Sequence, residues 1–199
     1  MKKIPAYAIV LLIATLMLAA VPTEADAAIY KDTLRLHILA ESDSEEDQRV
    51  KLLLRDEILT VFGEELSECR DIDDAKENVR GLIGEIEEHS QEFLNSIGID
   101  APVTASLSVE WYDTREYEDF TLPSGYYNSL RIIIGEGEGA NWWCVMYPPL
   151  CMDIATKDAP KDDATLGYTN EEVRLISGGK YNVKFKLLEV LSSAFAKND

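Results

Sequence analysis

The stretch from residue 130 to residue 151 constrains the fold more than any other part of the chain. A β-branched run is followed by glycines at alternate positions between residues 135 and 139, and then by an apolar, aromatic run at residues 141–147. Glycine permits the positive φ angles of tight turns, so this pattern predicts a strand, a turn and a second strand. Adjacent residues of a strand point to opposite faces. One of Trp142 and Trp143 therefore joins the core, and the other faces a second layer, a partner or solvent.

Residues 1–27 have the organisation of a secretory signal peptide. Lys2 and Lys3 precede an apolar run at residues 4–21, and Ala25-Asp26-Ala27 follows as a small-x-small cleavage site. An uncleaved membrane anchor is the alternative, because a run of this length is near the lower limit for spanning a bilayer. We favour cleavage after Ala27, and with either outcome the rest of the chain is exported.

The remaining chain, residues 28–199, has a length that suits one domain with a sizeable core. It keeps 17 basic and 35 acidic residues, so its net charge is −18. Such a charge repels phosphate backbones and anionic lipid headgroups, which argues against binding to nucleic acid and, after signal cleavage, to membranes. No second apolar run is long enough to cross a membrane.

Two helices are predicted after a buried strand at residues 34–40. The turn Glu41–Ser44 ends in a helix cap, formed by Asp43 with Glu46 or by Ser44 with Asp47. The first helix ends at Gly63. The second begins at Asp71 or Asp73 and stops at Gly98.

Strands dominate the chain after the second helix. Residues 103–112 alternate between apolar and polar side chains, so Val103, Ala105, Leu107, Val109 and Trp111 are expected on one buried face. A turn at residues 113–116, a returning strand at 117–122 and a strand at 126–134 follow. The order predicts an α+β fold, in which an antiparallel meander sheet has its helices packed on one face. A last helix is expected at about residues 181–196.

The candidate catalytic and metal-binding residues are few. Only His37 and His89 carry imidazole, and neither has a second Cys or His at ligand spacing, so we predict no metal site and no cofactor. A Cys144–His37 pair is the best nucleophilic arrangement available, although a histidine on a buried strand is more often structural. Cys144 and Cys151 are also a candidate disulfide pair around Pro148-Pro149, and a reactive thiol at Cys144 is the alternative.

Residues 34–48 (LRLHILAESDSEEDQ) and 139–151 (GANWWCVMYPPLC) resemble the stage II sporulation protein R family. Glu41 differs from the Asn expected before Ser-Asp-Ser, and Tyr147 stands where Phe is usual. The resemblance implies a signalling protein that is made in the forespore and exported into the space between the forespore and mother-cell membranes. There it would activate the membrane-embedded peptidase that cleaves the inactive precursor of the mother-cell sigma-E factor.

We therefore predict a protein that acts by binding and is not an enzyme. The expected contact surface consists of aromatic residues on a rigid turn, which bury a large area at low entropic cost. Its candidate residues are Asn141, whichever of Trp142 and Trp143 faces out, Tyr147, Pro148 and Pro149. Glu41 and Asp43, in the turn after the first strand, form a second candidate surface. Two alternatives remain open, namely an exported thiol- or carboxylate-dependent cell-wall hydrolase and a passive component of the space between the membranes.

Overall fold

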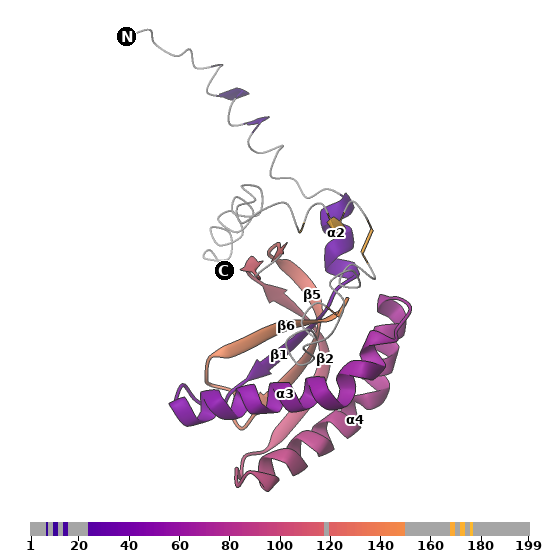
Figure 1. Ribbon diagram of the computed structural model, residues 1–199. Coiled ribbons are helices and arrows are strands. Elements are labelled where there is room, and N and C mark those ends of the chain that lie inside the picture. Colours follow the sequence, from indigo (N-terminus) through magenta and orange to yellow (C-terminus); the bar gives the residue numbers. More distant parts are fainter. Residues whose placement is uncertain are drawn as a thin grey trace, which may run out of the picture. The chain divides into compact units, whose positions relative to one another are not determined.

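The computed structural model describes residues 24–117 and 120–149, together with single positions at 7, 10, 11, 14, 15, 168, 169, 172, 173 and 176 (Figure 1). The chain divides into a larger unit, Ile29–Glu110 with Tyr126–Thr169, and a smaller unit that contains Trp111–Gly125 and both ends of the chain. Most of the expected signal peptide, Cys151 and the expected last helix lie outside the described residues. In the part of the chain that is described, no helix has both the length and the apolar character needed to cross a membrane.

Three helices are described, and local sequence signals set the start of the two long ones. After the short α2 (Glu24–Lys31) come α3 (Glu45–Ser67) and α4 (Ile72–Ser96). Ser44 caps α3 by accepting a hydrogen bond from the Asp47 N–H at 3.1 Å, and Asp71 caps α4 in the same way. The expected end of α3 at Gly63 was wrong. The helix continues to Ser67 because Leu66, which is fully buried, prolongs its apolar stripe.

The main sheet has the strand order β2 (Val103–Tyr112), β5 (Gly125–Ile134), β1 (Leu34–Leu39) and β6 (Asn141–Tyr147). The strand β1 runs parallel to β5 and antiparallel to β6, so the sheet is mixed and the predicted antiparallel meander was wrong. The strands β5 and β6 are consecutive in sequence, but β1 lies between them. A glycine-rich turn indicates that the chain reverses direction. It does not indicate whether the two flanking strands pair directly or a third strand lies between them.

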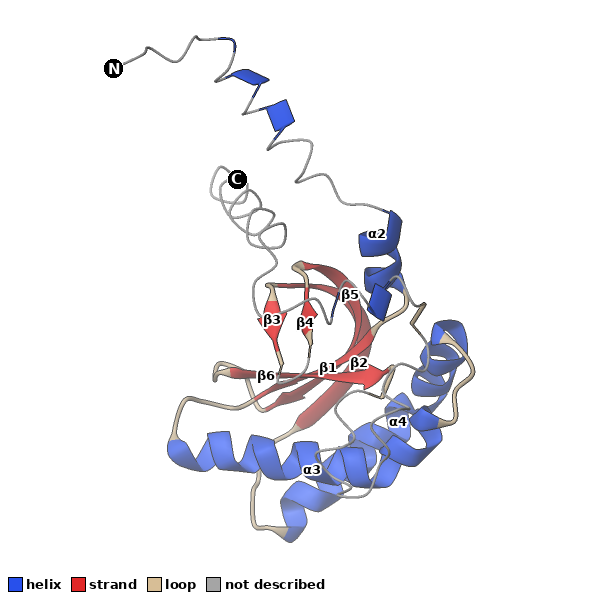
Figure 2. Ribbon diagram, turned by 45° about the horizontal axis from the view of Figure 1, so that its top comes forward, coloured by secondary structure: helices blue, strands red, loops and turns tan. Residues whose placement is uncertain are grey.

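The two long helices lie along the same side of the main sheet, as predicted (Figure 2). The register places Leu36 beside Leu130 and Cys144, and it places His37 beside Arg131 and Trp143. Leu36 and its neighbours face α3 and α4, because Trp142, which pairs with Ile38, contacts Arg55 of α3. Fully buried residues of this face form the core together with residues of the two helices. Those of the sheet include Leu34, Leu36, Ile38, Leu130 and Ile132, and those of the helices include Leu54, Ile58, Val79, Ile86 and Leu94. We call the opposite side of the sheet, which carries His37, the outer face.

The smaller unit contains a two-stranded antiparallel sheet of β3 (Arg115–Glu116) and β4 (Thr121–Leu122). The expected turn at residues 113–116 was therefore misplaced, because the chain reverses between Glu116 and Thr121. The rings of Tyr117 and Phe120 stack at 4.4 Å, and the Tyr117 N–H donates to the Phe120 carbonyl.

The predicted buried face of β2 is buried only where the strand begins. Val103 is 6% exposed, whereas Val109 is 65% exposed and Trp111 is 44% exposed. The strand lies at one edge of the described sheet, and α4 binds the amides of Val103 and Ala105 near its start. Strict alternation identified the strand correctly, but it could not show how far the covering helix extends.

The turn after β1 and the glycine loop after β5 bind each other, and we call this contact the loop clamp (residues 40–43 with 136–140). The Gly139 N–H donates to the Ala40 carbonyl at 2.9 Å. The Ala140 N–H donates to Asp43 Oδ1 at 2.6 Å, and the Glu136 N–H donates to Glu41 Oε2 at 3.0 Å. The side chains of this turn therefore satisfy main-chain groups of a loop almost a hundred residues away.

A buried lysine ties the loop clamp to α3. Lys51 is only 4% exposed, and its Nζ donates to the Ala140 carbonyl at 2.7 Å and to Gln48 Oε1. Burial lowers the pKa of the Lys51 ammonium, and the nearby Asp43 carboxylate partly offsets that effect. The first strand, the first long helix and the β5–β6 loop are thus fixed as one structural element.

A substitution at Gly139 tests the loop clamp. A Cβ at this position would lie 2.2 Å from the Ser42 carbonyl oxygen, so the two loops must separate to accommodate it. We expect Gly139→Ala to lower the free energy of unfolding by about 3 kcal/mol, the upper range for an overpacked site, measured by urea denaturation.

The matched control is Gly84→Ala in α4, where a Cβ would meet nothing within 4 Å. This change should raise the free energy of unfolding by about 0.5–1 kcal/mol, because alanine loses less backbone entropy than glycine in a helix. Equal effects of the two substitutions would contradict the loop clamp.

Candidate functional site

Polar and aromatic side chains from four strands meet on the outer face of the main sheet. His37 Nδ1 lies 2.9 Å from Glu110 Oε2, and His37 Nε2 lies 2.8 Å from Asn141 Oδ1. The Trp143 ring stacks on the imidazole, with ring centroids 5.7 Å apart. Arg131 Nη1 reaches Glu110 Oε1 at 3.4 Å. We call these five residues the histidine cluster.

The histidine cluster is partly accessible. The His37 and Glu110 side chains are 12% and 16% exposed, and the Arg131 side chain is 37% exposed. Asn141 is exposed and Trp143 is half-buried. On one side of the cluster the outer face is buried, at Arg35, Tyr127, Ser129 and Val145, whereas Thr104 and Ser106 of β2 are exposed. Among the described residues, the cluster is therefore a part of this face with exposed polar and aromatic side chains.

The Glu110 carboxylate is paired within the cluster, whereas the buried Arg131 Nε has no hydrogen-bond partner among the described residues. Burial raises the pKa of Glu110, but hydrogen bonds from His37 and Ser129, together with the charges of His37 and Arg131, outweigh it and leave the pKa lowered. Glu110 is thus held as a carboxylate. With an oxygen beside each ring nitrogen, both N–H groups of a protonated His37 would have an acceptor. The arrangement fixes the orientation of the imidazole.

The Cys144–His37 pair, considered above as the best available nucleophilic arrangement, does not form. Cys144 is in register with Leu36 and is 1% exposed, so its thiol lies on the helix side of the sheet while His37 lies on the outer face. A one-residue offset along a strand places two side chains on opposite faces, and the sheet separates them. His89 binds Glu57 at 2.8 Å, and its ring meets Phe62 edge-on, between α3 and α4. Within the described residues, no group of three or more potential metal ligands occurs.

The two tryptophans occupy opposite faces of β6, as their adjacency predicts. The Arg55 guanidinium of α3 lies 4.5 Å from the centroid of the Trp142 ring, so Trp142 belongs to the helix side. Trp143 and Asn141 lie on the outer face and are the predicted contact residues that the structure brings together.

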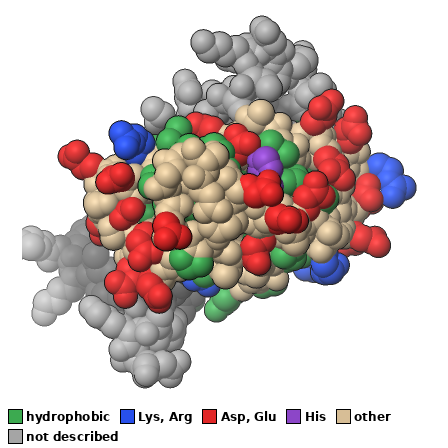
Figure 3. All heavy atoms as spheres, turned by 90° about the horizontal axis from the view of Figure 1, so that it is seen from below, with side chains coloured by type: hydrophobic (Ala, Val, Ile, Leu, Met, Phe, Trp, Pro, Cys, Tyr) green, Lys and Arg blue, Asp and Glu red, His purple; other side chains and the backbone are tan. Residues whose placement is uncertain are grey.

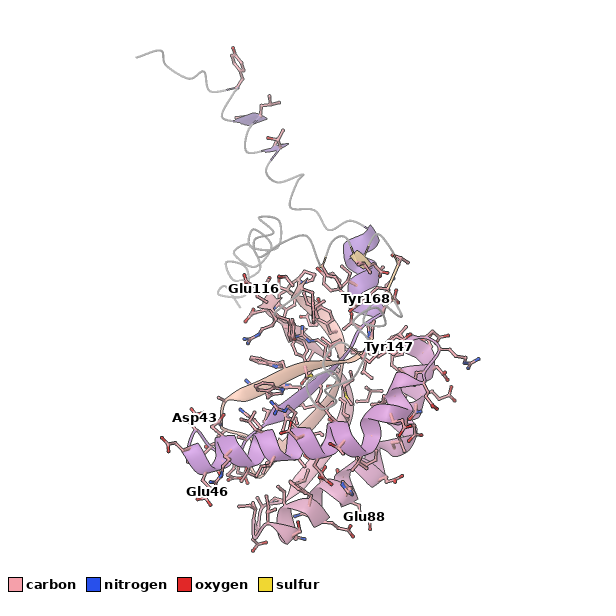
Figure 4. The ribbon with its side chains drawn as sticks, in the orientation of Figure 1. Asp43, Glu46, Glu88, Glu116, Tyr147 and Tyr168 are labelled. Atoms are coloured by element: carbon pink, nitrogen blue, oxygen red, sulfur yellow. The ribbon has the colours of Figure 1, made fainter. Side chains whose placement is uncertain are left out.

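The other predicted contact residues have different surroundings. Tyr147 is 4% exposed, Pro148 is buried and Pro149 is half-buried. Figure 4 shows Tyr147 at the opposite end of the sheet from Asp43, which lies beside the start of α3. Glu41 and Asp43 are engaged in the loop clamp. Cys151 lies outside the described residues, so its disulfide with Cys144 stays a prediction.

Sequence reasoning missed Glu110 and Arg131, and it set His37 aside as a structural residue. Arginine inside a β-branched strand and glutamate on the polar side of β2 were visible signals, but neither indicates a partner. Only the register joins them, because Arg131 pairs with His37 across two parallel strands that are almost a hundred residues apart.

The surface around the fold is strongly acidic. Figure 3 shows acidic side chains spread over one face of the molecule, with basic side chains at its margins. The full chain has a net charge of −18. Such a surface favours partners whose contacting groups are basic or neutral.

Comparison with known proteins gives one consistent result. The family model of stage II sporulation protein R matches residues 30–157. Stage II sporulation protein R of Bacillus subtilis (strain 168) is 32% identical over 130 residues, which is 65% of this chain and 58% of that protein. The chain thus spans less than two thirds of the length of this relative. No solved structure matches the chain.

The Glu110 carboxylate should make stability depend on pH. Because its pKa is lowered in the folded state, its stabilising effect is present above the unfolded pKa of about 4.3 and is lost as the pH falls through the folded value. We expect Glu110→Gln to cost about 1–3 kcal/mol at pH 7, the range for hydrogen bonds to a charged group. The difference from the wild type should shrink at pH 3, measured by urea denaturation at both pH values.

The control for this experiment is Glu88→Gln, on the exposed side of α4. It should leave the stability at pH 7 nearly unchanged, because surface substitutions rarely matter by more than about 0.5 kcal/mol. A difference between Glu110→Gln and wild type that is the same at pH 7 and at pH 3 would count against the described hydrogen bonds.

Proposed function

Because this chain belongs to the stage II sporulation protein R family, we propose that it is an exported signal that activates a membrane-embedded peptidase by binding it. The substrate of that peptidase is the inactive precursor of the mother-cell sigma-E factor. Family membership supports a role in sporulation. The peptidase partner and the space between the two membranes are our proposals, and they rest on what the family resemblance implies.

The observation that carries a binding function is the histidine cluster. Tryptophan and arginine are the side chains most enriched at energetically important interface positions. Here Trp143 and Arg131 lie on one half-exposed surface, and hydrogen bonds and ring stacking hold His37, Glu110 and Asn141 between them. Because these side chains are already ordered, a partner that contacts them loses little further conformational entropy.

The two sequence stretches that carry the family resemblance support the same surface. His37 comes from the first stretch, and Asn141 and Trp143 come from the second. Asp43 and Lys51 hold Ala140 in the loop clamp, directly before Asn141. The turn after β1 thus contributes to binding through the position of β6. This role accounts for Glu41 and Asp43 without direct contact to a partner.

A thiol-dependent hydrolase receives no support, because the register separates Cys144 from His37. The described contacts of His37 are with Glu110, Asn141 and the Trp143 ring, and together they fix the orientation of the imidazole. We therefore assign the imidazole a structural role within a binding surface.

The proposal is tested by reconstitution in a non-sporulating host that makes the peptidase and the sigma-E precursor. The chain is added with residues 1–27 and, separately, without them, and cleavage of the precursor is followed by immunoblot. Cleavage only with residues 1–27 present supports an exported signal that is sufficient by itself. Absence of cleavage with both forms would contradict the proposed function.

In the same host, Trp143→Ala and Arg131→Ala should each weaken activation. Loss of an interface residue of this kind costs about 2 kcal/mol, which is roughly 30-fold in binding, so more of the exported chain is needed for half-maximal cleavage. Val61→Ala, which truncates an exposed apolar side chain of α3, is the matched control and should behave as wild type. If all three variants activate equally, the histidine cluster is not the contact surface.

A further inference from the structure

The outer edge of β2 is covered over only part of its length. The strand β2 lies at one edge of the described main sheet, next to β5. Side chains of α4 bind its first outward amides, because Gln91 Oε1 accepts from the Val103 N–H at 3.0 Å and Glu87 Oε2 accepts from the Ala105 N–H at 2.8 Å. These side chains take the place of a neighbouring strand as far as Ala105.

Beyond Ala105, no such cover is present among the described residues. Alternate residues of a strand direct their N–H groups to the same edge, so Leu107 and Val109 direct theirs outward as Val103 and Ala105 do. In the described part of the chain, side chains of α4 accept hydrogen bonds from Val103 and Ala105, and none accepts from Leu107 or Val109. The Val109 side chain is 65% exposed.

The exposed edge also lacks the features that normally prevent strand pairing. Proteins protect exposed edges with charged side chains, proline or bulges. Residues 103–109 read VTASLSV and contain neither a charged residue nor proline, in a chain in which 28% of residues are charged. An uncharged, β-prone segment at an open edge favours pairing with another extended segment.

We infer that residues 106–109 of β2 receive an extended, positively charged segment of the partner protein, which joins the main sheet as an additional strand. This inference rests on the proposed function, because it states how the activated partner is held. A second copy of this chain is disfavoured as the occupant, since both copies would carry a net charge of −18. An incoming strand with lysine or arginine beside apolar residues matches the acidic surface and the exposed Val109. Glu110, in the same strand, places the added segment next to the histidine cluster.

The test combines amide hydrogen exchange with binding of the exported chain to membranes that carry the peptidase. We expect the exchange of the Leu107 and Val109 amides to slow when these membranes are added. The Val103 and Ala105 amides should change little, because α4 already binds them.

Val109→Lys should weaken binding about tenfold, which corresponds to roughly 1.4 kcal/mol. Val109→Thr keeps an uncharged β-branched residue and should bind as wild type. Val61→Lys, on α3, controls for the added charge.

Three results would overturn the inference. The first is unchanged exchange at Leu107 and Val109 with the membranes present, and the second is wild-type binding by Val109→Lys. The third is protection that depends on the concentration of this chain alone, which would identify a second copy as the occupant. Cleavage of the sigma-E precursor is scored separately. Amide protection without cleavage supports strand addition and contradicts the proposed activation. Cleavage without amide protection supports activation and contradicts strand addition.

Discussion

The loop clamp is the contact on which the rest of the structure depends. It joins the turn after β1 to the glycine loop after β5, and each side supplies what the other lacks. The glycine loop offers main-chain N–H groups, and the turn offers two carboxylates and two main-chain carbonyls. Gly139 permits the approach because any side chain there would meet the Ser42 carbonyl. With the loops joined, β1 is held between β5 and β6, so the sheet is mixed.

Inserting β1 between the two later strands also decides what each face contains. The register of β1 sends Leu36 and Cys144 toward the helices, and it sends His37, Arg131 and Trp143 to the outer face. A shift of one residue would exchange the two sets, placing charged groups in the core. The same constraint that packs the core therefore separates Cys144 from His37 and assembles the histidine cluster. Stability and the proposed binding surface have one structural origin.

A binding role is consistent with how the outer face is built. The accessible residues of this face bind one another through hydrogen bonds and ion pairs. The net charge of the chain, −18, favours partners whose contacting groups are basic or neutral. The open end of the β2 edge lies in the same strand as Glu110, so a single partner could use both features. For the binding role that we propose, a rigid surface next to a strand edge offers shape and main-chain hydrogen bonds together.

The sequence by itself determined the elements whose causes are local. Ser44 and Asp71 start the long helices, the alternation in residues 103–112 makes a strand, and adjacency separates Trp142 from Trp143. Each depends on residues within a few positions, where propensity and periodicity act. The tertiary structure alone decided the strand order, the exposure of Val109 and the meeting of His37 with Glu110, Arg131 and Asn141. These depend on which strand fills the gap between β5 and β6 and on how far α4 extends. Contacts between residues far apart in the chain settle both, and no local pattern encodes them.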